Sequence, residues 1–336
     1  MNERPSGRII SNVRRSALSG VVVSLLAACG GSTNAGADGA KQGDAAVSET
    51  GVIEAGEASS GEAGGGGGDA GDSGNTDGGG SCTLTANTTP TGTTNNGCAL
   101  VTRDTSACQA SRTSAGLTGF WSKFSCRVTL TAASGGATTV TVASDGQPDH
   151  ESNYFPTTDP CYAAYSPVAL DPNHIAVHAL SLTVPLAPTS GSQTMGLGPV
   201  GMALDGSAIF DNQAAPGDDI YAEAASFDRC QGHPSPASQY HYHTEPYAIS
   251  HDDDAFIGVM RDGYPIYGRR DVDGTLPANL DASGGHTGTT PDSPSTAVYH
   301  YHTNLQTSHT GATSGDTDWF LATGTYAGPP GSCTGC

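Results

Sequence analysis

Short runs of apolar and β-branched residues alternate with clusters of Gly, Pro, Asp and Asn from residue 82 onward. The clearest runs are residues 128–131, 138–142 and 175–184, which are rich in Val, Leu, Ile or Thr. Runs of this length between turn-forming residues are typical of β-strands. No long stretch of this region repeats apolar positions at helical spacing. The pattern therefore predicts a mainly β domain over residues 82–336, organised as a sandwich or a barrel-like sheet.

Residues 1–28 carry a different pattern. Arg14 and Arg15 precede an apolar run of about a dozen residues that ends at Ala28. A bilayer core of about 30 Å needs about 20 apolar residues, so this run is too short to span it and is typical of a signal peptide. Residues 26–30 read LAACG and resemble the lipobox of bacterial lipoproteins, in which the Cys becomes the diacylated N-terminus. The resemblance implies removal of residues 1–28 and lipidation of Cys29.

Export and anchoring follow from this resemblance. We expect the mature protein to be lipid-anchored to the bacterial cell envelope, at the outer membrane or the cell surface. Residues 14–18 (RRSAL) also resemble part of a twin-arginine signal, but the usual aromatic residue is missing, so ordinary Sec export is favoured. Residues 29–81 consist largely of Gly, Ala, Ser and Asp. Such a segment buries too little apolar surface to fold, and we interpret it as a flexible tether.

The negative charge of the chain disfavours some classes of binding partner. Its formal net charge is −20 at pH 7. Residues 82–336 hold 23 acidic and 8 basic residues, a net of −15. Nucleic acids and anionic surfaces bind clustered Lys and Arg, so this balance argues against either as a partner. Cations are the more natural ligands for the domain.

Eight cysteines remain once Cys29 is assigned to lipid. An even number in an oxidising compartment predicts up to four disulfides, but eight cysteines allow 105 connectivities and the sequence does not choose among them. Cys333 and Cys336 have the spacing of a redox motif. They lie at the end of the chain without a βαβ pattern, so a structural bridge is favoured. The other six are Cys82, Cys98, Cys108, Cys126, Cys161 and Cys230.

Three motifs occur twice in the same order, first within residues 201–244 and again within residues 258–303. The step from Asp205 to Asp262 in the opening motif nearly equals the step from Tyr240 to Tyr299 in the closing one. A nearly constant offset over three ordered motifs indicates an internal duplication of one β unit. The motifs are GMALDGSAIF at 201–210 and GVMRDGYPIY at 258–267, Gly-His at 232–233 and 285–286, and YHYHT at 240–244 and 299–303.

The histidines of the two YHYHT motifs are the main candidates for chemistry. Successive side chains of a strand point to opposite faces, so His241 and His243 share one face and the tyrosines share the other. Two imidazoles at this spacing can bind one zinc or copper ion. The same holds for His300 and His302. Because a duplicated unit can place equivalent strands about a pseudo-twofold axis, we expect all four to hold one ion or a close pair between the units.

Other histidines extend the candidate site. His233 and His286, in the Gly-His motifs, can each supply a third nitrogen, and His150 is a further candidate ligand. The alternative interpretation packs the tyrosines in the core and leaves the histidines on a solvated face without a ligand. The repetition of the whole pattern favours a metal. Acidic segments at residues 252–254 and 271–274 lack the distal Glu of an EF-hand, and we interpret them as turns rather than calcium sites.

The two YHYH tetrapeptides resemble the YHYH domain family, which is named for them and occurs in exported proteins. The resemblance extends through residues 228–233 (DRCQGH) and 262–268 (DGYPIYG), and covers roughly residues 140–305. It implies no established activity. The second Gly-His lies in residues 283–286 (SGGH), where the resemblance leads us to expect a Cys, and this makes the role of His286 less certain than that of His233.

These observations favour an extracytoplasmic lipoprotein that binds copper or zinc through imidazoles of both units. Two alternative functions belong to other classes of protein. One is a metal-dependent enzyme with an open coordination position, as when three histidines leave a water on zinc. The other is a disulfide-stapled surface or adhesion module whose histidines bind no metal. A closed site and an open one use the same residue types, so the sequence leaves open whether the protein is an enzyme.

Replacing Cys29 by Ser should release the protein from the membrane fraction, because the acyl chains on Cys29 are the only expected anchor. Fractionation followed by immunoblotting measures this. Persistent pelleting of the Cys29→Ser protein after a salt wash would contradict the lipoprotein assignment.

Overall fold

The computed structural model describes residues 82, 88–133, 136–166, 171–216, 218–306 and 318–336. All of them belong to one compact unit, Gly71–Cys336. The predicted signal peptide, Cys29 and the whole of the predicted tether (residues 29–81) lie outside the described residues. Among the helices that are described, none is long and apolar enough to cross a membrane.

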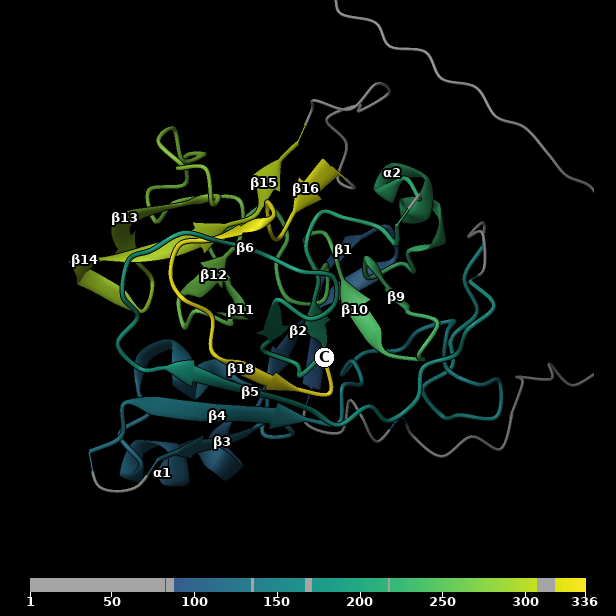
Figure 1. Ribbon diagram of the computed structural model, residues 1–336. Coiled ribbons are helices and arrows are strands. Elements are labelled where there is room, and N and C mark those ends of the chain that lie inside the picture. The colour runs from purple at the N-terminus through teal and green to yellow at the C-terminus, as the bar shows by residue number, and fades with distance from the viewer. Residues whose placement is uncertain (1–81, 83–87, 134–135, 167–170, 217, 307–317) are drawn as a thin grey trace, which may run out of the picture. The chain divides into compact units, whose positions relative to one another are not determined.

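An eight-stranded sheet forms the centre of the domain (Figure 1). Its strand order is β13-β14-β12-β11-β7-β8-β10-β9. All five residues of β11 and all three of β7 are buried, as expected for apolar strands in the middle of a sheet. The strands are β7 (Gly201–Ala203), β8 (Ala208–Ile209), β9 (Gly232–Pro234), β10 (Tyr240–Tyr242), β11 (Phe256–Met260), β12 (Pro265–Tyr267), β13 (Gly285–Thr290) and β14 (Ser293–His302).

The sheet consists of two equivalent halves, which bears out the duplication predicted from the sequence. Strands β7 to β10 make one half and β11 to β14 the other, with the same internal order. The halves meet where β7 pairs antiparallel with β11 and Met202 lies opposite Val259, its equivalent in the second repeat. A pseudo-twofold axis therefore passes through this pair. Figure 1 shows the consequence, because β9 and β10 lie at one end of the sheet and β13 and β14 at the other.

A second, four-stranded sheet packs against the first. Val140, Val142, Leu182 and Val184 alternate with less buried residues and point into the same apolar core as Met202. This two-layer arrangement is sandwich-like, and within the described residues neither sheet closes into a barrel. The strands, in the order β18-β5-β4-β3, are β3 (Thr129–Ala132), β4 (Thr139–Ser144), β5 (Leu180–Pro185) and β18 (Ser332–Thr334).

One strand is shorter than its sequence pattern predicts. The sequence predicts a strand within the β-rich run at residues 175–184, but β5 begins only at Leu180. The preceding backbone hydrogen-bonds to loops, with the Ile175 N–H donating to the Tyr154 carbonyl and the His178 N–H to that of Asp145. Leu180, Leu182 and Val184 alternate and are buried, whereas Val177 and Ala179 are exposed, so only the second part of the run pairs within the sheet.

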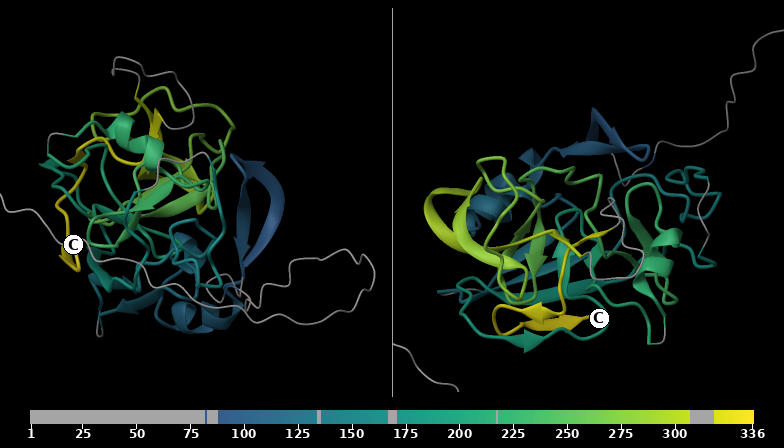
Figure 2. Two further views of the ribbon diagram at one scale, coloured as in Figure 1. Left: turned by 90° about the vertical axis from the view of Figure 1, so that its right-hand side faces the viewer. Right: turned by 90° about the horizontal axis from the view of Figure 1, so that it is seen from above.

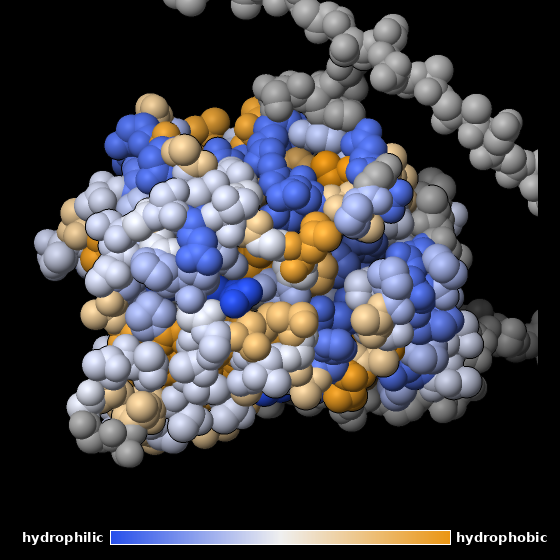
Figure 3. Space-filling view, in the orientation of Figure 1, coloured by the Kyte–Doolittle hydropathy of each residue, from blue (hydrophilic) through white to orange (hydrophobic). Residues whose placement is uncertain are grey.

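Smaller elements surround the sheets. The hairpin of β1 (Thr88–Asn95) and β2 (Cys98–Arg103) stands at the periphery of the domain in both views of Figure 2. On the face shown in Figure 3, hydrophobic residues form separate patches among hydrophilic ones. The remaining elements are α1 (Ser106–Ser114), η2 (Gly119–Lys123), β6 (Gln193–Thr194), α2 (Ile220–Glu223), η3 (Ala224–Ser226), β15 (Asn304–Leu305), β16 (Trp319–Phe320) and β17 (Thr325–Tyr326).

All eight cysteines predicted to form disulfides do so. The Cys98–Cys230 bond joins segments 132 residues apart and ties the β1–β2 hairpin to the turn that precedes β9. Cys333–Cys336 closes a short loop at the end of the chain, in line with the structural bridge favoured by the sequence. Such bonds persist in oxidising compartments and are typical of exported proteins. The other pairs are Cys82–Cys161 and Cys108–Cys126.

Removal of the long-range disulfide should destabilise the domain far more than removal of the short one. The double change Cys98→Ala with Cys230→Ala should lower the free energy of unfolding by roughly 2–5 kcal/mol, because the bond restricts a long loop of the unfolded chain. Urea unfolding of this variant and of the matched Cys333→Ala, Cys336→Ala variant measures the difference. Equal losses in the two variants would contradict this account.

Candidate metal centres

The first cluster of candidate ligands lies at the β9–β10 end of the large sheet. His233 lies directly opposite His241 in the pairing of these strands, and His243 follows β10 on the same face. The Nε2 atoms of His241 and His243 are 3.0 Å apart. Glu223, at the end of α2, places Oε1 3.3 Å from His233 Nε2. The four potential ligand atoms all lie within 4.8 Å of one another.

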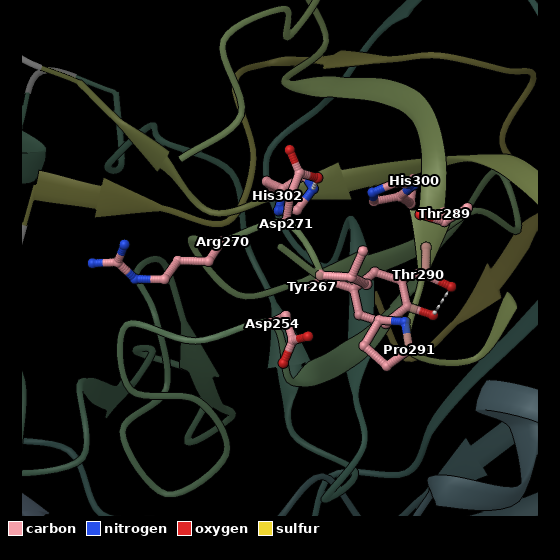
Figure 4. A pocket seen from close by; sticks show the side chains of 10 residues that line it. Asp254, Tyr267, Arg270, Asp271, Thr289, Thr290, Pro291, His300 and His302 are labelled. Carbon is pink, nitrogen blue, oxygen red and sulfur yellow. Dashed lines mark hydrogen bonds and ion pairs between the residues drawn. The ribbon is translucent and has the colours of Figure 1, made fainter. Parts of the chain in front are cut away.

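The second cluster lies at the opposite end of the sheet and repeats this plan. His286 lies opposite His300 in the β13–β14 pairing, and its Nε2 is 3.1 Å from that of His300 and 3.3 Å from that of His302. Asp271 Oδ1 lies 3.1 Å from His286 Nε2 and 3.4 Å from His302 Nε2. Figure 4 shows the ring of His300 extending toward His302 and Asp271, while the neighbouring Arg270 points away.

In each of the six imidazoles the Nδ1 atom is engaged by a hydrogen-bond partner, and the partners are equivalent in the two halves. His241 and His300 donate to the carbonyl two residues before them, and His243 and His302 donate to carbonyls in the segments after β8 and β12. Since a carbonyl only accepts, the proton of these rings is on Nδ1. The partners are the Gln239, Val298, Asp211 and Gly268 carbonyls, Ser226 Oγ for His233 and Asn279 Oδ1 for His286.

The Nε2 atoms that converge in each cluster are consequently bare acceptors. Burial lowers the pKa of His233 to about 3, with the nearby His243 adding to the effect, and lowers the pKa of His243 and His300 to about 4. These rings are therefore neutral near pH 7. Within the described residues, neither His233 Nε2 nor Glu223 Oε2 has a hydrogen-bond partner. Lone pairs this close repel one another unless a cation lies between them.

The tyrosines of the two motifs lie on the opposite face and are anchored to aspartates, of which Asp205, Asp228 and Asp262 are buried and Asp281 is exposed. Tyr242 donates to Asp205 at 2.9 Å, and Tyr301 donates to the equivalent Asp262. Tyr240 donates to Asp228 at 2.9 Å. The same bond recurs between Tyr299 and Asp281 at 3.1 Å.

The Gly of each Gly-His motif allows the tyrosine to take this position. A Cβ on Gly232 would lie 2.4 Å from the Tyr240 ring, and a Cβ on Gly285 would lie 2.5 Å from the Tyr299 hydroxyl. Any side chain at either position would push the tyrosine away from its aspartate. The Gly-His spacing is therefore a packing requirement as well as a source of ligands.

The structure corrects two expectations from the sequence and excludes one part of the alternative interpretation, the solvated histidine face. The four YHYH histidines do not meet at one site, because the halves join through β7 and β11 and leave β10 and β14 at opposite ends. The histidine face is not solvated, since all six histidines are buried. His150 lies outside both clusters, on the tyrosine side of the sheet, where its Nε2 is 2.9 Å from the Tyr242 hydroxyl.

The two carboxylates were missed by sequence reasoning. Glu223 lies upstream of the first Gly-His and belongs to no repeated motif. Asp271 was interpreted as part of a turn, and its backbone N–H does bond to the Thr275 carbonyl across that turn. The repeat offset does not relate the two acids. Only proximity in the fold identifies them as ligands.

The comparisons with known proteins fit this site. Residues 181–278 match the model of a family described as YHYH protein. The chain carries a YHYH domain. The match includes the first YHYH strand and ends before the second, whereas the resemblance seen in the sequence extended over roughly residues 140–305. No curated protein and no solved structure matches the chain.

The two units of the large sheet hold their Gly-His turns by different means. In the first, Asp228 accepts from the Cys230 and Gly232 N–H groups, and Cys230 is bridged to Cys98. In the second, Asp281 accepts from the Ser283 and Gly285 N–H groups without a disulfide. His286 nevertheless joins its cluster as closely as His233 does, so the missing Cys does not displace it.

The metal-free YHYH domain should lose stability as the pH falls below neutral. An unfolded imidazole, with a pKa of about 6.5, binds a proton at pH 5, whereas buried His243, with a pKa of about 4, does not. The unfolded state then binds more protons, so a lower pH favours unfolding by about 2 kcal/mol for such a residue. The free energy of unfolding, measured by urea unfolding in EDTA, should fall between pH 7.5 and pH 5.0. In the His243→Gln variant this fall should be smaller by about 2 kcal/mol. The exposed His174→Gln serves as control, and equal pH dependence of the two variants would refute the expectation.

Proposed function

We propose that this protein is an extracytoplasmic lipoprotein that binds two transition-metal ions, copper or zinc, one in each unit of its YHYH domain. Three imidazole Nε2 atoms and one carboxylate hold each ion. The first set is His233, His241, His243 and Glu223. The second set is His286, His300, His302 and Asp271.

The observation that carries this proposal is the convergence of imidazole Nε2 atoms, at separations of 3.0–3.3 Å, in both clusters. Zinc bonds to imidazole nitrogens at about 2.0–2.1 Å, which places the ligand atoms of a tetrahedral site about 3.3 Å apart. Three Nε2–Nε2 distances of 3.0–3.3 Å and three imidazole–carboxylate distances of 3.1–3.4 Å lie close to that value, and no two ligand atoms of a cluster are more than 4.8 Å apart. Neutral imidazole is also the ligand type that suits zinc and copper.

The surroundings of the histidines support the same proposal. Metal-ligating histidines generally donate their second ring N–H to a carbonyl, a carboxylate or water, which fixes the tautomer and raises the basicity of the ligand. Five of the six histidines have their Nδ1 bonded to a backbone or side-chain carbonyl, and that of His233 is bonded to the Ser226 hydroxyl. Each cluster also contains one carboxylate, and the two carboxylates come from positions that the repeat does not relate. Duplication of the histidines alone would therefore not have placed a carboxylate in both clusters.

The proposal also includes the location of the protein and its attachment to the membrane. Lipidation of Cys29 anchors the protein to the envelope, and residues 29–81 act as a tether that gives the metal-binding domain reach from the membrane. The disulfides fit such an oxidising location.

Metal analysis of the purified protein tests the proposal. We expect two copper or zinc ions per chain, falling to one in either the His241→Ala, His243→Ala variant or the His300→Ala, His302→Ala variant, and to none when all four are replaced. Circular dichroism should show the β-rich fold retained. His174→Ala is the matched control, because this exposed histidine lies outside both clusters.

A metal that binds only the folded state raises the melting temperature, by the equivalent of about 4 kcal/mol at a concentration a thousandfold above its dissociation constant. If the protein carries no transition metal, and neither copper nor zinc moves its melting temperature, the proposal fails. A surface or adhesion module without metal would then be the better description.

A further inference from the structure

The two proposed metal centres differ in what lies beside them, and the following inference rests on the proposed function. A cavity of about 180 Å³ borders His241 and His243 at the first centre. The space beside His300 and His302 has no room for a water-sized group. We propose that the first centre binds a small uncharged ligand through a nitrogen or sulfur donor, and that the second centre is closed and structural.

The difference in free space beside the two centres arises at one pair of equivalent positions, one in each unit. The Asp211 and Gly268 carbonyls bind His243 and His302 in the same way, so these residues are equivalent. Three residues further along, the first unit has Ala214 and the second has Asp271. Asp271 lines the narrow space of the second centre, and Ala214 lines the cavity of the first. A methyl group thus stands where the other unit has a ligand carboxylate.

The carboxylate of the first centre comes from a different direction. Glu223 ends the four-residue helix α2 and lines the cavity wall. Its Oε1 lies 3.3 Å from His233 Nε2, and its Oε2 has no hydrogen-bond partner among the described residues. Asp271 Oδ1, by contrast, lies within 3.4 Å of two imidazoles. Zinc sites can expand to five ligands, so a donor from the cavity can add to the first centre while Glu223 stays bound or moves aside.

The lining of the cavity indicates the class of ligand. Leu197, Phe210 and Pro216 give it apolar walls. The carboxylates of Glu223 and Asp171 border the same cavity, which disfavours an anion. An uncharged molecule with a small apolar body fits both features. Since zinc and copper bind imidazole nitrogens and soft sulfur, the donor atom is expected to be one of these.

Cobalt substitution with imidazole as the probe tests the inference. The protein is loaded with Co²⁺ and titrated with imidazole while the visible d–d absorption is recorded. A protein with only the first centre (His300→Ala, His302→Ala) should bind imidazole at least about tenfold more tightly than one with only the second (His241→Ala, His243→Ala). Azide should bind the first centre at least about tenfold more weakly than imidazole.

Exchange of the corresponding residues provides the matched controls. Ala214→Asp should keep the cobalt content but weaken imidazole binding at the first centre by at least about tenfold. Ala214→Leu fills the same space without a carboxylate and should act in the same direction. Asp271→Ala should make the second centre respond to imidazole. Circular dichroism shows that each variant is folded.

The possible failures are distinguishable. If neither single-centre protein binds cobalt, the proposed function fails and this inference fails with it. If both bind cobalt but respond equally to imidazole, or if the two Ala214 variants leave the response unchanged, only the assignment of the first centre as the ligand-binding one is overturned.

Discussion

The hydrogen bonds between tyrosine hydroxyls and aspartates, three of which are buried, hold the histidine strands in place, and the geometry of both candidate centres depends on them. Tyr240 and Tyr242 reach Asp228 and Asp205 on one face of the sheet. Because neighbouring residues of a strand alternate faces, fixing the tyrosines fixes the histidines between and after them. Rotation of the strand would leave buried hydroxyls and carboxylates unpaired, at a cost of about 1–3 kcal/mol for each group. The imidazoles are therefore preorganised before any ion binds.

Much of this arrangement could be predicted from the sequence, because it depends on local periodicity. Alternation within YHYH separates tyrosines from histidines, and the constant offset between motifs reveals two equivalent units. The Gly-His motifs were recognised as part of the pattern, and the third ligand of each cluster comes from them. What the sequence did not supply was the reason for the glycine, which is the close passage of Tyr240 over Gly232.

The relation between the units could not be predicted, since an offset identifies equivalent residues but not neighbouring ones. A pseudo-twofold axis can bring equivalent strands together or hold them apart. Here it passes between Met202 and Val259, so the first strands of the two units pair and the histidine strands lie at opposite ends of the sheet. The fourth ligands were hidden for a related reason. Glu223 and Asp271 come from positions that the duplication does not relate, and nothing periodic marks them.

The element that carries each carboxylate determines how freely that carboxylate can move at the proposed centres. Asp271 follows shortly after β12, which pairs with both β11 and β14, so an ion held by Asp271 links neighbouring parts of one sheet. Glu223 lies on the short helix α2, outside the sheet. Movement of Asp271 would disturb the turn that follows a paired strand, whereas movement of Glu223 requires only α2 to shift. In the proposed centres, the duplication would therefore give one set of ligands that are all joined to the sheet and one set in which a ligand could exchange while the strands stay in register.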